Sequence, residues 1–283
     1  MRLREALTDF TTRLRAARID EAPLEAEVLL RHALGIDRRC YVLRLGEEVT
    51  PDDLEYARAL LARRLRHEPL AYVTGQREFY GLLFTVTPDV LIPRPETELL
   101  VERALAHVTA WVGSRPPLVA DIGTGSGCVA IAIARSTAHA RIIGTDVSQG
   151  ALAIAQLNAR QLRVAGRLEW LQGDLLAPLP EPPDIVTANL PYIPSGEITE
   201  LQPEIRAFEP IQALCAGEDG LALIRRLLEQ AELRLTRGAV LLIEVAAGQA
   251  PAVADLARDL LPGAEIVIHR DLAGTGRCVE VVR

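Results

Sequence analysis

The sequence predicts an α/β protein with a doubly wound, mostly parallel sheet whose last strand is antiparallel, preceded by a small N-terminal helical domain and a β-hairpin connector. From Leu118 onward, apolar strand-like runs alternate with helical patterns, which is typical of βαβ units and a parallel sheet covered on both faces. The last two runs are joined only by the link 271–276, which is too short for a crossover helix and favours antiparallel pairing. Residues 1–75 carry helical patterns instead.

The N-terminal domain, residues 1–75, is expected to consist of short helices. Over 22–35, Gly35 suits a left-handed C-terminal cap. Over 50–68, Thr50 suits the N-cap, and apolar residues recur at helical spacing. No residue pattern in this domain indicates catalysis.

The connector, residues 76–95, changes character. Aromatic and β-branched residues around Gly81 predict a hairpin, and the prolines of the stretch "TPDVLIPRP" stiffen the chain after it. A helix is expected to begin near Glu96. The third domain is therefore expected to run from 96 to 283.

Composition limits the classes of function. With 283 residues, of which 49% are hydrophobic, the chain suggests one large domain and a smaller one. A net charge of −7 argues against general binding to nucleic acid. The chain contains no apolar run long enough to cross a bilayer and no signal-peptide pattern, so we expect a cytoplasmic protein. The four cysteines are scattered, which indicates neither a metal site nor a disulfide framework.

A glycine-rich loop, "DIGTGSG", directly follows the first strand of the third domain. Glycines at Gly123, Gly125 and Gly127 allow a sharp turn and a close approach of the backbone to a ligand at a helix N-terminus. The dinucleotide fingerprint GxGxxG is excluded because position 128 is Cys128. GxGxG after Asp121 resembles the nucleoside-binding loop of class I S-adenosylmethionine-dependent methyltransferases, although a tight turn alone would also explain the glycines.

Two acidic residues end the next two strands. Asp146 lies where a carboxylate can accept hydrogen bonds from both ribose hydroxyls, and an NAD enzyme would use the same acid. Asp174 is expected near the adenine edge, with Leu175 against the ring. The loop and the two acids at the ends of successive strands together favour a nucleotide site over coincidence.

The stretch "ANLPY" follows the fourth strand, beside the expected cofactor. An amide or aromatic-amine nitrogen is a poor nucleophile, so its methylation needs acceptors that hold the NH₂ protons and offset the developing positive charge. The Asn189 side-chain oxygen and the Leu190 carbonyl can supply these acceptors, and the Tyr192 ring can pack on a planar group. The same letters are also typical of a simple turn.

The order and spacing of several segments identify a family. The segments "GQREFYG", "TPDVLIPRPETE", "DIGTGSG", Asn-x-Pro-Tyr, "FEP" and "GEDG" resemble the HemK/PrmC family over nearly the whole chain. These enzymes methylate the glutamine of the GGQ motif in peptide-chain release factors. The resemblance implies transfer of a methyl group from S-adenosylmethionine, with S-adenosylhomocysteine as product, to the side-chain nitrogen N5 of that glutamine. It also implies that residues 1–75 recognise the substrate.

The resemblance assigns site residues by position. The implied cofactor site consists of Gly123, Thr124, Gly125, Ser126, Gly127, Asp146, Asp174, Leu175 and Asn189. The implied substrate pocket consists of Arg94, Pro95, Glu96, Asn189, Leu190, Pro191 and Tyr192, of which the last four form the catalytic corner. Arg94 and Glu96 could instead form an ordinary ion pair between connector and domain. No metal is implied, and we expect a monomer whose partner is the release factor.

The chain departs from the family at Leu190, where the family usually has a second proline. The carbonyl is retained, and Pro191 still restrains Leu190 to extended conformations. We expect a loss of about 0.4–1 kcal/mol of preorganisation and a modest reduction in rate, unless the leucine side chain intrudes on the pocket.

The main alternative function is amino methylation of adenine in RNA or DNA, against which the acidic balance counts. A second is a non-catalytic interaction protein that retains the fold, against which the intact Asn189, Asp146 and glycine loop argue.

Overall fold

The computed structural model describes residues 1–283, which form two units. The helical unit consists of Met1–Gly75 together with Gln202–Phe208. The sheet unit consists of Gln76–Leu201 and Glu209–Arg283. The segment 202–208 falls within the third domain expected from the sequence, whereas its contacts place it with the helical unit.

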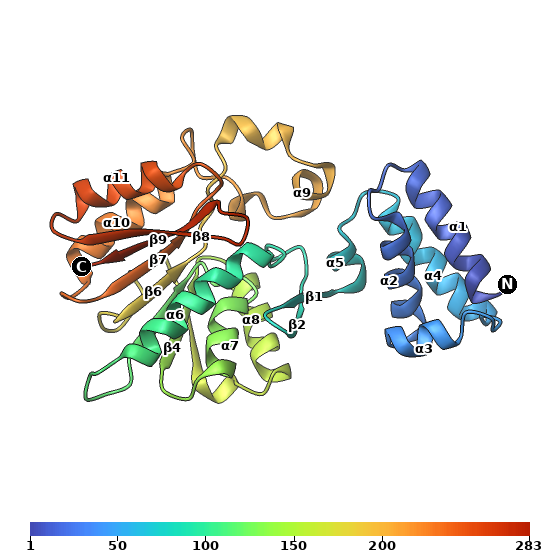
Figure 1. The fold of residues 1–283 in the computed structure, drawn as a ribbon, viewed down its shortest axis with the longest axis horizontal. Coiled ribbons are helices and arrows are strands. Elements are labelled where there is room, and N and C mark those ends of the chain that lie inside the picture. The colour runs from blue at the N-terminus through green and yellow to red at the C-terminus, as the bar shows by residue number, and fades with distance from the viewer. The chain divides into compact units, whose positions relative to one another are not determined.

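The helical unit is built around one apolar core. Its helices are α1 (Leu3–Ala16), α2 (Ala22–Leu34), α3 (Arg38–Leu43), α4 (Pro51–Arg64), α5 (Leu70–Thr74) and α9 (Pro203–Phe208) (Figure 1). Phe10, Leu30 and Leu61 are fully buried in its centre. Both predicted helix ends are confirmed, because the Thr50 hydroxyl accepts a hydrogen bond from the Asp53 amide at 3.2 Å and Gly35 ends α2 with a φ of 60°.

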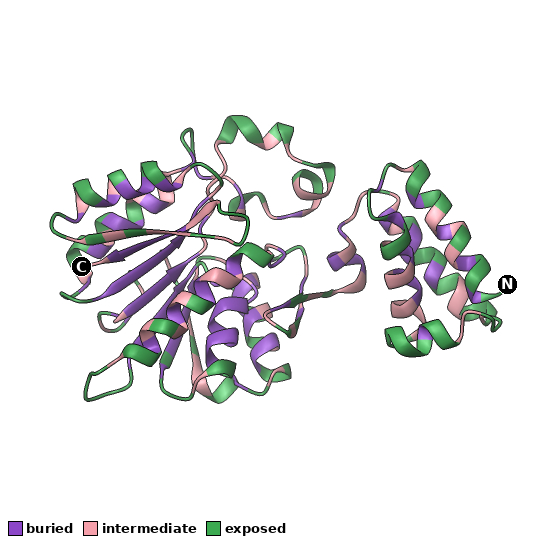
Figure 2. Cartoon of the chain, viewed as in Figure 1, coloured by how far each residue is buried: buried purple, intermediate pink, exposed green.

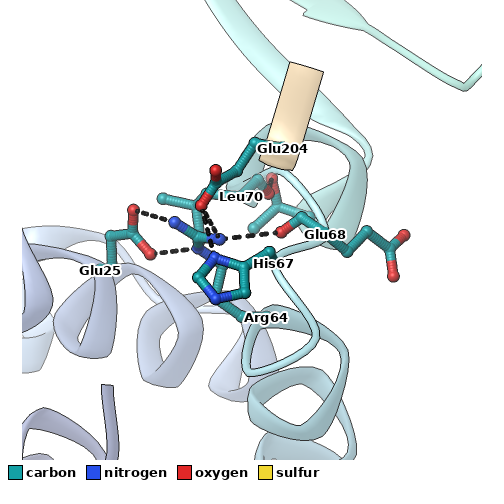
Figure 3. Close-up of polar contacts among 7 residues, drawn as sticks. Glu25, Arg64, His67, Glu68, Leu70 and Glu204 are labelled. Atoms are coloured by element: carbon teal, nitrogen blue, oxygen red, sulfur yellow. Dashed lines mark hydrogen bonds and ion pairs between the residues drawn. The ribbon is translucent and has the colours of Figure 1, made fainter. Parts of the chain in front are cut away.

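A buried arginine explains why α9 belongs to this unit. Arg64, only 5% exposed, donates from Nε to Glu25 on α2 at 2.5 Å and from Nη1 to Glu204 on α9 at 3.1 Å (Figure 3). His67 Nδ1 lies 3.0 Å from the same Glu204 oxygen. We call these four residues the Arg64 cluster. Its partners come from distant parts of the sequence, so local patterns could not predict it.

The sheet unit begins with the predicted hairpin. Its strands are β1 (Gln76–Phe79) and β2 (Leu82–Thr85), paired antiparallel. Tyr80 and Gly81 at the turn have φ values of 51° and 69°, the positive pair that a tight hairpin turn requires. Asn158 fixes the hairpin to the rest of the unit, since its Oδ1 accepts from Thr85 N at 2.8 Å and its Nδ2 donates to Thr85 O at 3.0 Å.

The main sheet confirms the predicted fold class. Its strands are β3 (Leu118–Ile122), β4 (Arg141–Asp146), β5 (Leu168–Gln172), β6 (Ile185–Ala188), β7 (Val240–Glu244), β8 (Glu265–Arg270) and β9 (Gly276–Val282), in the order β5-β4-β3-β6-β7-β9-β8. The last strand, β9, pairs antiparallel with both β7 and β8, and all other pairs are parallel. The expected antiparallel pairing of the last two strands is therefore confirmed. The insertion of β9 between β7 and β8 was not predicted.

Helices cover both faces of this sheet. They are α6 (Glu98–Ala110), α7 (Cys128–Ser136), α8 (Gln149–Gln161), α10 (Ala222–Arg234) and α11 (Ala250–Leu260), with short 3₁₀ turns at η1 (Pro95–Thr97), η2 (Ala165–Arg167), η3 (Ser195–Glu200) and η4 (Ile211–Ala213). One apolar cluster joins the sheet to α10 and α11, and a second joins it to α6 and α7. The central strands are buried while the outer helix faces are exposed (Figure 2). None of the helices has the length and apolar character needed to cross a membrane.

Candidate functional site

A pocket lies at the carboxyl ends of β3, β4 and β6, where open α/β sheets bind ligands. Of the residues predicted for the site, it is lined by Arg94, Gly123, Thr124, Gly125, Ser126, Asp146, Asp174, Leu175, Asn189, Leu190 and Pro191. Pro95, Glu96, Gly127 and Tyr192 do not line it. The pocket therefore brings together the glycine loop, the ends of β4 and β5 and the corner after β6.

The glycine loop connects β3 to α7 and needs its glycines for conformation and for space. All three loop glycines have positive φ values, which side chains disfavour. A Cβ added at Gly123 would lie 3.1 Å from Leu190 Cδ2 and 3.7 Å from the Asn189 carbonyl oxygen. The loop and the corner are thus packed against each other, and a larger residue at Gly123 would push them apart.

Asp121, at the end of β3, links this loop to β6. Its side chain is buried and accepts hydrogen bonds from the hydroxyls of Thr124 at 2.6 Å and Thr187 at 2.8 Å. Burial raises the pKa of Asp121 to about 6, although the two hydroxyls partly counter this effect. No cation pairs with Asp121, so its role in the fold depends on these neutral donors.

Asp146 ends β4 and holds the loop from the other side. Its Oδ2 accepts from Gly125 N and its Oδ1 from Ser148 N, both at 2.9 Å. Each carboxylate oxygen can accept two hydrogen bonds, so both retain capacity for hydroxyls of a ligand. Burial raises the pKa of Asp146, and the backbone hydrogen bonds oppose the rise.

Asp174 and Leu175 follow β5 and line the same pocket. Asp174 Oδ2 accepts hydrogen bonds from Arg226 Nη2 at 2.6 Å and Gln230 Nε2 at 3.2 Å, both on α10. Leu175 is buried with a φ of 51°, and its carbonyl accepts from the Thr145 hydroxyl at 3.1 Å. Contact of these two residues with an adenine ring remains a prediction.

The corner after β6 presents two free acceptors. Asn189 Nδ2 donates to the Thr97 hydroxyl oxygen at 3.0 Å. Its Oδ1 accepts no hydrogen bond from the chain, and neither does the carbonyl oxygen of Leu190. Both residues line the pocket. The arrangement can therefore hold a group that has two N–H donors.

The side chain of Leu190 is 4% exposed and belongs to the apolar cluster beneath α10 and α11. It packs over Gly123 rather than lying free in the pocket. The leucine thus contributes packing that a proline could not supply to the same extent.

Arg94 is fixed by an acidic residue for which the sequence alone indicates no role. Glu209, from the "FEP" segment, pairs with Arg94 Nη2, and its Oε2 accepts from Ile92 N at 3.1 Å. The Glu209 side chain is 1% exposed. The ion pair that Arg94 forms is with Glu209, whereas Glu96 lies 4.0 Å from Arg277.

Tyr192 lies behind the pocket, where its backbone is held from two sides. Its carbonyl accepts from Gln249 Nε2 at 2.9 Å. A Cβ added at Gly220, whose φ is 72°, would lie 2.5 Å from that carbonyl oxygen. Gly220, the last residue of the "GEDG" segment, is therefore required for the close approach of this loop to the corner.

Two residues near Asn189 were not predicted from the sequence. Thr97 lines the pocket and is 1% exposed. Glu244, at the end of β7, is 3% exposed, and its Oε2 has no hydrogen-bond partner. Burial raises the pKa of Glu244 to about 7, and the Thr97 side chain opposes the rise. An acidic residue inside the apolar run "VLLIEVA" was the available signal.

No group of three or more His, Cys, Asp or Glu side chains is arranged to hold a metal ion.

Two family models match separate parts of the chain. The model described as the PrmC N-terminal domain matches residues 5–75. The model described as a methyltransferase domain matches residues 119–208.

Similar proteins cover most or all of the chain. The release factor glutamine methyltransferase of Cereibacter sphaeroides is 41% identical over 279 residues, covering 99% of this chain and 98% of that protein. The release factor glutamine methyltransferase of Geobacter sulfurreducens is 42% identical and covers 83% of this chain and 81% of its own length. The structure of a T. thermophilus 16S rRNA N2 G1207 methyltransferase with AdoMet and guanosine aligns with a TM-score of 0.50 at 16% identity, covering 74% of this chain and 49% of that one. This last likeness concerns the fold alone.

Proposed function

The chain belongs to the release factor glutamine methyltransferase family, and from this premise we propose that it transfers a methyl group from S-adenosylmethionine to N5 of the glutamine in the GGQ motif of a peptide-chain release factor. The two free acceptors at the corner, Asn189 Oδ1 and the Leu190 carbonyl, are the observation that carries this proposal. A primary amide has two N–H donors, and two fixed acceptors match them.

The pocket fits S-adenosylmethionine, which supplies a methyl group on a cationic sulfonium when bound. The glycine loop leaves space that side chains would fill, and Asp146 keeps an accepting lone pair on each oxygen for the ribose hydroxyls. Asp174 and Leu175 would hold the adenine end. These residues bind and orient the nucleoside, and none of them needs to exchange a proton.

The corner residues act on the acceptor amide. Its nitrogen lone pair is delocalised, so the chain has to hold that nitrogen in one orientation and offset the positive charge that develops on it. Asn189 Oδ1 and the Leu190 carbonyl oxygen do both by accepting hydrogen bonds from the two N–H groups of the amide. No general base is needed in the slow step, because the nitrogen becomes acidic as it is alkylated. Arg94, held by Glu209, would line the substrate side, with Pro95, Glu96 and Tyr192 as its predicted neighbours.

The helical unit is proposed to recognise the release factor outside the GGQ motif. The match of residues 5–75 to a domain model specific to this family supports that role. Chemical cross-linking of the bound release factor should therefore reach residues 1–75. We further propose that the chain is a cytoplasmic monomer. It should not bind nucleic acid, because its net charge is −7.

A labelled-methyl assay with purified release factor tests the function. Label should enter the release factor and disappear when its GGQ glutamine is replaced by alanine. RNA and DNA are offered in parallel reactions, since amino methylation of adenine is the competing function. Preferential labelling of nucleic acid would overturn the proposal.

A further inference from the structure

The turn that follows β5 contains a residue in a strained conformation. Ala177 N donates to the Asp174 carbonyl oxygen at 3.0 Å, so residues 174–177 form a turn. Its first inner residue, Leu175, has a φ of 51°, which residues with a side chain rarely adopt. Such a conformation persists only where surrounding contacts hold it, and it is typical of ligand sites. Asp174 and Leu175 both line the pocket.

Gln230, on α10, holds this turn on both sides of Leu175. Its Oε1 accepts a hydrogen bond from Leu176 N at 2.9 Å, and its Nε2 donates to Asp174 Oδ2 at 3.2 Å. One partner only donates and the other only accepts, so a single orientation of the Gln230 amide satisfies both. Arg226 donates to the same Asp174 oxygen at 2.6 Å, but its side chain is 50% exposed. Gln230 is therefore the contact that fixes the turn from inside the protein.

These contacts leave one acceptor and one donor of the turn unused. Both bonds from α10 go to Asp174 Oδ2, so Asp174 Oδ1 accepts no hydrogen bond from the chain. Leu175 N donates to no group of the chain. Adenine presents the complementary pair on one edge, because its amino group donates and its N1 accepts. Hypoxanthine has a carbonyl in place of the amino group and a proton on N1, so it presents the reverse at both positions.

We propose that Gln230 is a positioning residue, which holds Asp174 Oδ1 and the Leu175 N–H as a matched acceptor and donor for the adenine of the cofactor. This inference rests on the cofactor part of the proposed function. Without the Gln230 amide, the Asp174 carboxylate could turn and Leu175 could leave its strained conformation. Gln230 does not itself line the pocket, so its effect reaches the ligand through these two residues.

Equilibrium binding of two ligands tests this proposal without any turnover. The ligands are S-adenosylhomocysteine and its hypoxanthine counterpart, S-inosylhomocysteine, and isothermal titration calorimetry gives Kd for each. The ratio of the two Kd values measures discrimination between the bases. A general loosening of the pocket weakens both ligands and leaves the ratio unchanged, whereas loss of the matched acceptor and donor lowers the ratio.

Two variants of Gln230 and one control are compared. Gln230→Met removes both hydrogen bonds and keeps an unbranched side chain of similar length. Gln230→Glu keeps an acceptor for the turn but replaces the donor with a charge that repels Asp174. Gln249→Met is the matched control, because Gln249 is also partly buried and its amide also bridges two groups, accepting from Ala246 N at 3.0 Å and donating to the Tyr192 carbonyl at 2.9 Å. Urea denaturation gives the stability of each variant.

The wild type should bind the adenine form about 10- to 100-fold more tightly than the hypoxanthine form, the discrimination expected of one bidentate pair. In Gln230→Met, Kd for S-adenosylhomocysteine should rise about tenfold and Kd for the hypoxanthine form should stay nearly constant. Gln230→Glu should lower the ratio at least as far. In an Asp174→Ala background, Gln230→Met should cost less, because one of the two contacts through which it acts is already lost. Gln249→Met should keep the wild-type ratio.

A wild-type ratio in Gln230→Met, or an equal fall in Gln249→Met, would overturn the inference. Equal weakening of both ligands by Gln230→Met, in step with a loss of stability, would show a merely structural role and would overturn it too. If Gln230→Met does not fold, Gln230→Glu decides by the same criteria. A wild type that discriminates between the bases but leaves the release factor unmethylated would overturn the proposed substrate and not this inference. A wild type that binds neither ligand would overturn both.

Discussion

Acidic side chains of low exposure have two contrasting environments in this chain. In the helical unit, the partly buried Glu25 and Glu204 accept charged hydrogen bonds from Arg64. Beside the pocket, Asp121 and Glu244 are buried and form no ion pair, and Asp121 accepts hydrogen bonds from the hydroxyls of Thr124 and Thr187. The first arrangement holds one segment of the chain to another. The second places strong acceptors where they can orient small hydrogen-bond donors.

The difference shows in the pKa values. Burial raises the pKa of Asp121 to about 6 and that of Glu244 to about 7. Burial alone would also raise the pKa of Glu204, but hydrogen bonds with His67 and Arg64 outweigh it and lower the pKa. Acids that pair with a cation therefore stabilise the folded state. The unpaired acids at the pocket lower its stability when they are ionised.

The largest expected effect is on the paired side of this comparison. Arg64→Met should lower the free energy of unfolding by about 3–5 kcal/mol, because it removes a buried cation and leaves two partly buried carboxylates without their partner. The matched control is Arg258→Met, since Arg258 pairs with Asp255 at the surface, with side-chain exposures of 59% and 74%. That control should change stability by about 1 kcal/mol or less. Equal losses of unfolding free energy in the two variants, measured by urea denaturation, would contradict the distinction between the Arg64 ion pairs and the exposed Arg258 pair.

The next effect is on the pocket side. Asn189→Ala should lower kcat about 10²- to 10³-fold, as removal of one fixed charge-stabilising group does in other enzymes. Stability and cofactor Kd should remain close to the wild type, because the Asn189 side chain has only one partner within the chain, Thr97. Steady-state kinetics and isothermal titration measure these quantities. Normal turnover of this variant would refute the mechanism of the corner.

The two regions should respond to pH with opposite signs. Glu244 holds its proton more tightly in the folded protein, so its unfavourable contribution is absent below the ordinary pKa of 4.5 and develops as the pH rises to about 7. Glu204 has a lowered pKa, so its contribution is present above 4.5 and is lost as the pH falls through the lowered value. Urea unfolding over a pH series should show that Glu244→Gln removes a loss at higher pH and that Glu204→Gln removes a loss at lower pH. The same slope in both variants would contradict this comparison.

The smallest expected effect is at Leu190. Leu190→Pro restores stiffness, which should raise kcat by about two- to fivefold, the equivalent of about 0.4–1 kcal/mol. The same change removes a side chain that is 4% exposed and packed in the core, so the free energy of unfolding should fall. A gain in stability without a change in kcat would contradict both the packing role of the Leu190 side chain and the effect of stiffness on the rate.

The sequence predicted the features that depend on local patterns. The glycine loop, the hairpin around Gly81, the caps at Thr50 and Gly35 and the antiparallel last strand each leave a signal within a few residues. The family resemblance pointed to Asn189. Each of these predictions needs only neighbouring residues or the order of motifs along the chain.

The features that escaped prediction depend on distant contacts. Arg94 meets Glu209, which is 115 positions away, and Arg64 meets Glu204, which is 140 positions away. Glu244 lies near Asn189 because β6 pairs with β7, and Asn189 bonds to Thr97, which comes from before α6. A single sequence does not reveal which of its many acids will face a given arginine or hydroxyl.

The most direct test of the central claim is to locate the transferred methyl group by tandem mass spectrometry of the release factor. After incubation with the wild-type enzyme and S-adenosylmethionine, the glutamine of the GGQ peptide should carry one methyl group on its side-chain nitrogen, and the Asn189→Ala reaction should leave that peptide unmodified. A methyl group on another residue, or an equally modified peptide in the Asn189→Ala reaction, would contradict the claim that this corner holds the glutamine amide for methylation.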